Sequence, residues 1–206
     1  MTFISDSLNR IKPSATMVIT AKAAQLKREG KKVIGLSAGE PDFDTPDHVK
    51  VAAIDAIHKG YTKYTNVEGI PELRQAIIDK FKKDNCLSYS INDVIVGTGG
   101  KQILFNALVG SINKDDEVII PAPYWVSYPD MTLLAGGKPV IVSCNQETDF
   151  KLTAKELEEV ITKKSKWLIL NSPSNPTGSC YSRKELEEIA DVVRKHKNLY
   201  LSLIHI

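Results

Sequence analysis

The residues with the clearest chemical potential form a glycine-rich turn, GTGGK at 97–101, between a short apolar run and a helical pattern. The first N–H groups of a helix have no partner within the helix, and the helix dipole favours an anion there. Glycines allow close approach, so Gly99, Gly100 and Lys101 could hold a phosphate, although a plain tight turn explains them equally well. The turn is not the dinucleotide fingerprint, because Gln102 stands where that motif requires a glycine.

Two further candidate segments follow predicted strands. PAPYW at 121–125 comes after a predicted strand, where residues line the ligand crevice of a parallel sheet. Trp125 could stack on a planar ring there, or it could be a core residue that fixes a loop. NSPSNPTG at 171–178 follows the next predicted strand, and its prolines beside asparagines predict a rigid turn that can aim an amide at a ligand oxygen.

Other residues with chemical potential do not form convincing sites. Asp42 and Asp44 could ligate a metal, but no histidine or carboxylate cluster supports them, and turn or cap roles explain them better. The histidines lack triad spacing, and the three cysteines are far apart without a Cys-x-x-Cys pair. We therefore predict no metal site and no disulfide framework.

The elements that must position these residues alternate between helical and strand periods. In chain order, helices are predicted over 6–11, 15–29, 46–60 (with Thr45 as N-cap), 71–81, 100–108, 126–135, 154–163 and 183–195. Strands are predicted over 32–37, 94–96, 117–120, 139–143 and 167–170, with a last apolar stretch from Leu199. This alternation predicts an α/β fold with a mostly parallel sheet, helices on both faces and an N-terminal arm before it.

Composition narrows the class of protein. The 206 residues are 42% hydrophobic and 25% charged, which is typical of a globular chain and excludes a disordered one. The net charge of +2 gives no electrostatic reason to expect nucleic acid or membrane surfaces as partners. No apolar run is long enough to span a membrane and no secretory signal is visible, so we expect a cytoplasmic protein.

Taken together, the motifs resemble the pyridoxal-phosphate-dependent class I aminotransferases of fold type I, most closely the bacterial-type aspartate aminotransferase subgroup. The matching segments occur in the family's order: SAGEPDFDTP at 37–46, KYTNVEGIPELRQAI at 63–77, GGKQILFNAL at 99–108, PAPYWVSYP at 121–129 and NSPSNPTG at 171–178. The resemblance covers residues 4–201. It also implies cis peptide bonds at Ala122–Pro123 and Asn175–Pro176, where the chain must turn sharply at strand ends.

The resemblance implies roles toward pyridoxal 5′-phosphate. Gly99, Gly100 and Lys101 match the phosphate cradle, in agreement with the physical interpretation of that turn. Trp125 matches the aromatic residue stacked on the pyridine ring, and Asn175 matches the asparagine that hydrogen-bonds the phenolic oxygen. Both of these residues also border the substrate.

It implies roles toward the substrate and a second subunit as well. Gly39 matches the glycine whose N–H holds the substrate α-carboxylate. Tyr64 matches the tyrosine that reaches the cofactor phosphate of the other subunit in a homodimer. Thr16 and Lys101 match positions that help to hold the distal carboxylate of an acidic substrate.

The family's catalytic residues are not found in this sequence. The Schiff-base lysine, the α-carboxylate arginine and the aspartate of an S-D-E-x-Y motif should come at or after the last strand, but the chain reads LYLSLIHI at 199–206. We expect an N-terminal piece of a longer protein. It would comprise an arm and part of the small domain (1–45), a truncated cofactor-binding large domain (46–201) and a non-native tail (202–206).

The expected reaction of the full-length parent is amino transfer from L-aspartate to 2-oxoglutarate, giving oxaloacetate and L-glutamate, with the piece itself inactive. Transamination of prephenate or aromatic substrates is the alternative within the family. A pyridoxal-phosphate-dependent lyase of the same fold is a second alternative. A domain that lacks the cofactor and serves only as a partner surface is a third.

Overall fold

A computed structural model describes residues 3–36, 39 and 41–205. The chain forms two compact units, which are described separately. The α/β unit comprises the residues up to Lys12 together with those from Thr98 onward, and the helical unit is Pro13–Gly97. The division at residues 45 and 46 that the sequence suggests remains a prediction.

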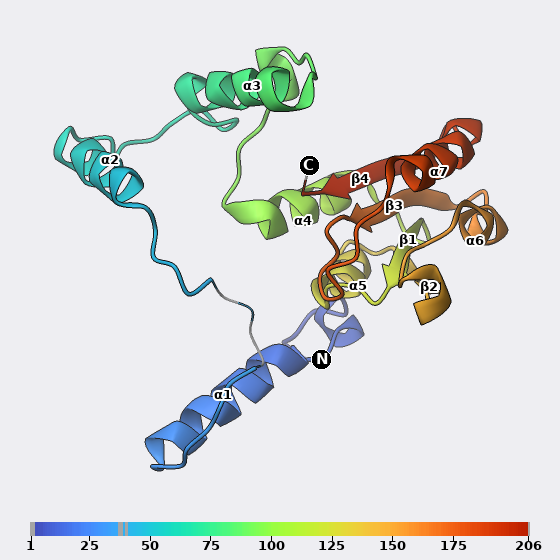
Figure 1. Ribbon diagram of the computed structural model, residues 1–206, viewed down its shortest axis with the longest axis horizontal. Coiled ribbons are helices and arrows are strands. Elements are labelled where there is room, and N and C mark those ends of the chain that lie inside the picture. The colour runs from blue at the N-terminus through green and yellow to red at the C-terminus, as the bar shows by residue number, and fades with distance from the viewer. Residues whose placement is uncertain (1–2, 37–38, 40, 206) are drawn as a thin grey trace. The chain divides into compact units, whose positions relative to one another are not determined.

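The α/β unit is built on four parallel strands in the order β2-β1-β3-β4 (Figure 1). The strands are β1 (Glu117–Ala122), β2 (Lys138–Ser143), β3 (Ser165–Asn171) and β4 (Tyr200–Ile204). Ile119 of β1 lies opposite Val140 of β2 and Leu168 of β3, which in turn pairs with Leu201 of β4. Because all strands run the same way, the loops after β1 and β3 leave the sheet at the same edge.

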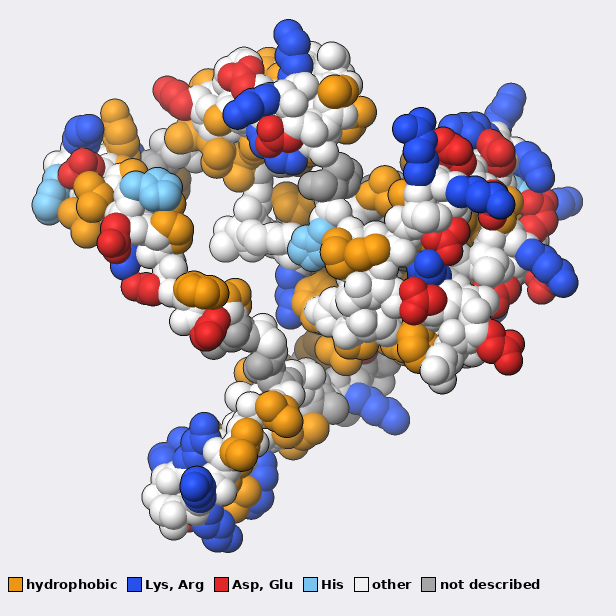
Figure 2. Space-filling view, in the orientation of Figure 1, with side chains coloured by type: hydrophobic (Ala, Val, Ile, Leu, Met, Phe, Trp, Pro, Cys, Tyr) orange, Lys and Arg blue, Asp and Glu red, His pale blue; other side chains and the backbone are white. Residues whose placement is uncertain are grey.

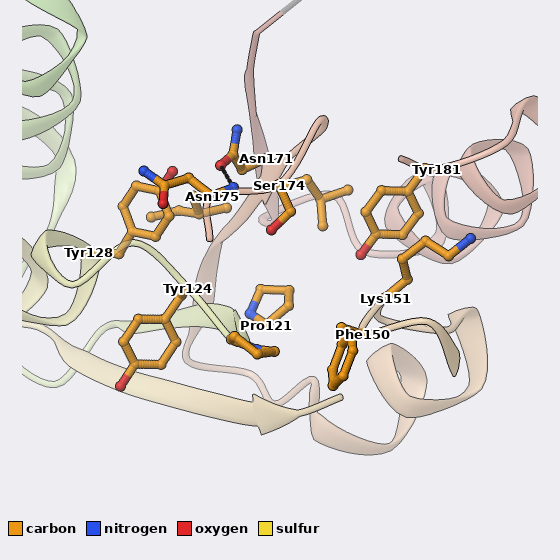
Figure 3. Close-up of a pocket in the computed structure, with 12 residues that line it drawn as sticks. Pro121, Tyr124, Tyr128, Phe150, Lys151, Asn171, Ser174, Asn175 and Tyr181 are labelled. Carbon is orange, nitrogen blue, oxygen red and sulfur yellow. Dashed lines mark hydrogen bonds between the residues drawn. The ribbon is translucent and has the colours of Figure 1, made fainter. Parts of the chain in front are cut away.

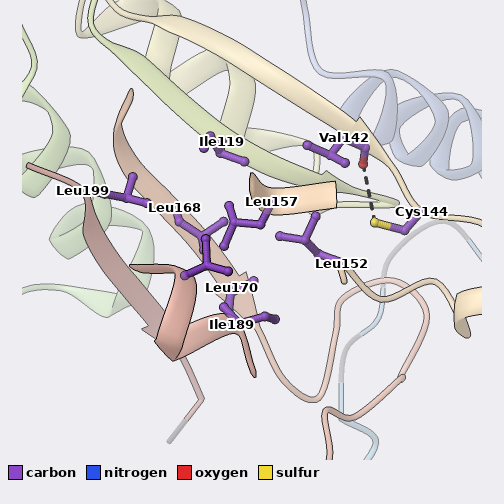
Figure 4. Packing of buried hydrophobic residues seen from close by; sticks show 10 residues of the cluster. Ile119, Val142, Cys144, Leu152, Leu157, Leu168, Leu170, Ile189 and Leu199 are labelled. Atoms are coloured by element: carbon purple, nitrogen blue, oxygen red, sulfur yellow. Dashed lines mark hydrogen bonds between the residues drawn. The ribbon is translucent and has the colours of Figure 1, made fainter. Parts of the chain in front are cut away.

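Helices cover both faces of this sheet, as the sequence predicts. They are α4 (Gly99–Ser111), α5 (Ser127–Leu134), α6 (Ala154–Val160) and α7 (Arg183–Lys195), with short 3-10 helices at Leu8–Arg10 and Gln146–Thr148. Successive residues of a strand point to opposite faces. Ile119 therefore packs with Leu157 of α6 and Ile189 of α7 (Figure 4), while the neighbouring Ile120 packs with Leu108 of α4.

The start of each outer helix is fixed by a capping box. Thr153 accepts the Glu156 N–H at the start of α6, and Ser182 accepts the Glu185 N–H at the start of α7. In both cases the glutamate side chain accepts the N–H of the cap residue in return. Acidic and basic side chains are interspersed over the outer surface of α6 and α7 (Figure 2), which gives that surface no single-sign charge.

The helical unit contains α1 (Ala15–Arg28), α2 (Asp47–His58), α3 (Pro71–Asn85) and a 3-10 helix, Ile91–Asp93. Arg74 is the most buried charged side chain among the described residues of this unit, and its guanidinium donates to the carbonyls of Val94 (3.0 Å) and Ile91. Gly69 has φ +105°, and a Cβ there would lie 2.9 Å from Val96, so this turn requires glycine. None of the described residues of α2 is buried within the chain.

Several predicted element bounds are wrong. Residues 32–36 and 94–96 are not strands, because a short apolar run becomes a strand only when another strand pairs with it, and none does so among the described residues; Ser37 lies outside them. The helix expected over 6–11 is only a 3-10 turn, α6 ends at Val160, and α2 begins at Asp47 with Pro46, not Thr45, at the N-cap position.

The last strand extends into the segment that the sequence analysis sets apart as a tail. Ser202 pairs with Ile169, and Ile204 pairs with Asn171 at the end of β3. The side chains of 202–204 thus belong to a regular parallel strand beside β3. The non-native origin of residues 202–206 remains a prediction.

Candidate active site

A cavity of about 860 Å³ opens on the α/β unit where the loops after β1 and β3 leave the sheet. Its walls come from the first turns of α4, the loop after β1, the turn after β3 and the end of β4. Four residues singled out from the sequence meet in its lining: Gly100, Lys101, Trp125 and Asn175. Gly99 immediately precedes Gly100 at the start of α4.

The first turn of α4 is an open backbone cradle. Gly99 has φ +80°, and no atom lies within 4 Å of a Cβ placed on Gly99 or Gly100. The Thr98 side chain does not cap this helix end, although the Gln102 side chain accepts the Thr98 N–H, and the first turn contains no acidic residue that would offset the helix dipole. A thirteen-residue helix whose glycine-rich first turn is open to ligands fits an anionic group such as a phosphate.

An aromatic pair stands beside this cradle. Trp125 packs edge-to-face on Tyr128, with ring centroids 5.4 Å apart and an interplanar angle of 83°. Tyr128 is buried, and burial raises the pKa of its hydroxyl to about 12, so the phenol stays neutral. The Lys101 ammonium lies 4.8 Å from the centroid of the Trp125 ring. Trp125 is thus both a part of the core cluster around Tyr128 and a part of the cavity lining.

Two hydrogen bonds of the Asn171 side chain fix the turn after β3. The Asn175 N–H donates to Asn171 Oδ1 (2.7 Å), and the Asn171 amide donates to the Ile204 carbonyl (3.4 Å). These bonds hold the backbone of Asn175 beside the ends of β3 and β4, and Asn175 is among the residues that line the cavity.

Both cis peptide bonds predicted from the sequence, Ala122–Pro123 and Asn175–Pro176, are confirmed. A third cis bond, Ser172–Pro173, lies in the same motif and was not predicted. Tyr128 and Asn171 were also missed as cavity residues. Tyr128 lies within the matched PAPYWVSYP segment and Asn171 begins the NSPSNPTG segment, so membership of these segments was the available signal.

A second, small cavity of about 20 Å³ lies beside the turn (Figure 3). Tyr124, Asn171, Ser174 and Tyr181 are among the residues around it. Its volume suits about one water molecule rather than a substrate. The Tyr181 hydroxyl accepts the Leu152 N–H (2.8 Å), and burial raises the pKa of Tyr181 to about 12. We therefore interpret the residues around this small cavity as packing that supports the turn after β3.

Lys151, beside the small cavity, ties the loop before α6 to the start of α7. Its ammonium lies 2.7 Å from Glu185 and 3.7 Å from Asp149. The hydrogen bond from Lys151, together with those from Ser182, lowers the pKa of Glu185 from 4.5 to about 2. A carboxyl whose pKa is lower in the folded chain stabilises it fully above the unfolded value and loses this contribution as the pH falls.

Glu185→Gln is therefore expected to destabilise the chain at pH 7 by up to about 1 kcal/mol, because the carboxylate is partly exposed and its ion pair is screened by solvent. The difference from wild type should shrink as the pH falls from about 5 toward about 2. Urea unfolding across this pH range measures it. Glutamine preserves the capping box, and Glu159→Gln on the exposed side of α6 is the control. A difference that is independent of pH would contradict the assignment.

Three predicted residues, Thr16, Gly39 and Tyr64, lie in the helical unit. Tyr64 and Gly39 are exposed there. The substrate and dimer roles that the resemblance gives these residues stay predictions. Among the described residues, no group of three or more histidine, cysteine or acidic side chains could hold a metal, and no helix is long and apolar enough to cross a membrane.

The sequence model of the family described as aminotransferase class I and II matches residues 31–202. The chain belongs to this family. It is 60% identical over 196 residues to a probable aspartate/prephenate aminotransferase of Rickettsia bellii, covering 95% of this chain and 49% of that protein. It is 59% identical to the aspartate/prephenate aminotransferase of Cereibacter sphaeroides, covering 98% and 50%.

Solved aminotransferases share the fold. The aspartate aminotransferase of Rhizobium meliloti matches with a TM-score of 0.94 and 48% identity, over 98% of this chain and 51% of that one. The Thermus thermophilus aspartate aminotransferase with maleate matches with a TM-score of 0.94 and 45% identity, over 98% and 53%. The chain thus spans about half the length of the relatives that it matches.

Proposed function

We propose that the α/β unit of this aminotransferase chain binds pyridoxal 5′-phosphate. We further propose that the whole protein transfers the amino group of L-aspartate to 2-oxoglutarate, giving oxaloacetate and L-glutamate. The observation that carries the proposal is the single cavity lined by Gly100, Lys101, Trp125 and Asn175. A phosphate-sized anion site, an aromatic face and an amide there match the three chemical parts of this cofactor.

The described residues suit the chemical groups of the cofactor. The open N–H groups at the start of α4 and the Lys101 ammonium suit its phosphate, because both favour negative charge. Trp125 suits its planar ring, and the Asn175 carboxamide can donate to its phenolic oxygen. When bound, pyridoxal phosphate supplies an electron sink for the amino acid substrate.

The substrate assignment rests on the relatives and on charge. Both curated relatives carry aspartate/prephenate in their names, and the Thermus protein was solved with maleate, a dicarboxylate. Lys101 is a cation in the cavity lining that can attract a second carboxylate. The relatives' names make prephenate the second candidate substrate. Nothing in the described site favours a lyase over an aminotransferase.

The proton-transferring lysine is proposed to lie in the part of the relatives' length that this chain does not span. Lys101 is the only lysine among the described residues that line the cavity, and it belongs to the phosphate end. We also propose that the whole protein is a cytoplasmic homodimer in which Tyr64 reaches the other subunit's phosphate group.

Calorimetric titration with pyridoxine 5′-phosphate tests the cofactor site. This analogue has no aldehyde, so it cannot form imines with surface lysines. We expect Trp125→Ala and Asn175→Ala each to weaken binding about threefold to tenfold, as the loss of one stacking contact or one hydrogen bond predicts. The control Asn198→Ala, exposed beside β4, should leave binding unchanged. Equal affinity of all four proteins would place the ligand elsewhere.

A further inference from the structure

The ammonium of Lys101 is placed over an aromatic ring and forms no ion pair with a carboxylate among the described residues. Its Nζ lies 4.8 Å from the Trp125 ring centroid. No aspartate or glutamate is among the described residues that line this cavity, and none forms an ion pair with Lys101 among the described residues. Attraction to the ring's π electrons thus positions this cation in the chain.

A planar ligand that stacks on the Trp125 face under the Lys101 ammonium would have to displace that ammonium. Lys101 and Trp125 line one cavity, so we infer that an incoming ring and the ammonium compete for this face. Lys101 lies in the first turn of α4, next to the open cradle of Gly99 and Gly100. A phosphate at the cradle would offer the ammonium a charge-assisted partner in place of the ring.

We propose that the Lys101 ammonium covers the Trp125 ring face. The site thereby binds rings that carry a phosphate in preference to the same rings without one. A ring without phosphate must displace the ammonium and gives it no new partner. A phosphorylated ring displaces the ammonium and pairs with it. This inference rests on the proposed cofactor site and adds a selective role for a residue in it.

The selectivity has a test in which the two ligands respond in opposite directions. In Lys101→Ala, pyridoxine should bind about twofold to fivefold more tightly, because no cation–π contact has to be broken. Pyridoxine 5′-phosphate should bind about tenfold or more weakly, because a hydrogen bond to a charged group is lost. Lys155→Ala, exposed on α6, is the control and should change neither affinity. Pyridoxine affinity that is unchanged or lower in Lys101→Ala overturns the proposal.

A ligand-free measurement tests the contact itself. Lys101→Ala should change tryptophan emission in the wild-type background and leave it unchanged in a Trp125→Phe background, with circular dichroism showing that all variants are folded. An equal change in both backgrounds, or in neither, overturns the proposal. If pyridoxine 5′-phosphate binds to no variant, the proposed cofactor site fails, and the emission comparison still decides whether Lys101 covers Trp125. If it binds to wild type but pyridoxine does not gain affinity, only the selectivity fails.

Discussion

The 206-residue chain is expected to show no measurable amino transfer from aspartate to 2-oxoglutarate, even with excess pyridoxal 5′-phosphate. The cavity proposed to bind the cofactor has only one lysine among its described lining residues, Lys101, and we propose that Lys101 serves the phosphate. Loss of a general acid–base group alone costs about 10²–10⁴ in rate. Oxaloacetate formation, followed by coupling to malate dehydrogenase and NADH absorbance, measures the reaction.

The same residues joined to the second half of a close relative provide the positive control. The joined protein should turn over at least about 10²-fold faster than the chain alone, and Trp125→Ala should then slow it. Amino transfer by the purified 206-residue chain would contradict the proposal that the catalytic lysine lies outside it. Loss of that activity in Lys101→Ala would then identify Lys101 as the base.

Gly137→Ala is expected to lower the free energy of unfolding of the α/β unit by about 1–3 kcal/mol, the usual range for overpacking. A Cβ at Gly137 would lie 2.8 Å from Ile112 Cγ2 and 3.0 Å from the Asp116 carbonyl oxygen. The carbonyl cannot move without cost, because it accepts the Lys138 N–H (2.8 Å) where β2 begins. Urea unfolding monitored by circular dichroism measures the change.

Gly110→Ala is the matched control, with the opposite sign. Gly110 lies within α4, and no atom is within 4 Å of its Cβ position. Alanine is a better helix former than glycine by about 0.5–1 kcal/mol, so this variant should be more stable than wild type. Equal effects of the two substitutions would show that packing around Gly137 is looser than the structure indicates.

The core strands and the bounds of α7 could be predicted from the sequence because their signals are local. The apolar run of β1 and its burial on both faces follow from a strand with helices on either side. The bounds of α7 agree with the prediction, since Ser182 and Glu185 form a capping box and the apolar residues repeat with the helical period.

Features that depend on distant pairing could not be predicted in the same way. Residues 32–36 and 94–96 have apolar runs similar to those of true strands, but strand formation requires a partner that no local pattern identifies. The Asn171 carboxamide joins the site through its bonds to Asn175 and to Ile204, thirty-three residues away. The contact between Lys101 and Trp125 likewise joins α4 to the loop after β1, and sequence spacing does not show it.

The proposed function depends most on a phosphate site at the start of α4. Glycine-selective ¹⁵N labelling and titration with pyridoxal 5′-phosphate test it directly, because the chain has glycines both in the cradle and far from it. We predict that the amide resonances of Gly99 and Gly100 move with added ligand, while those of Gly110 and Gly136 stay in place. Unmoved Gly99 and Gly100 resonances at concentrations where the ligand binds would contradict the claim.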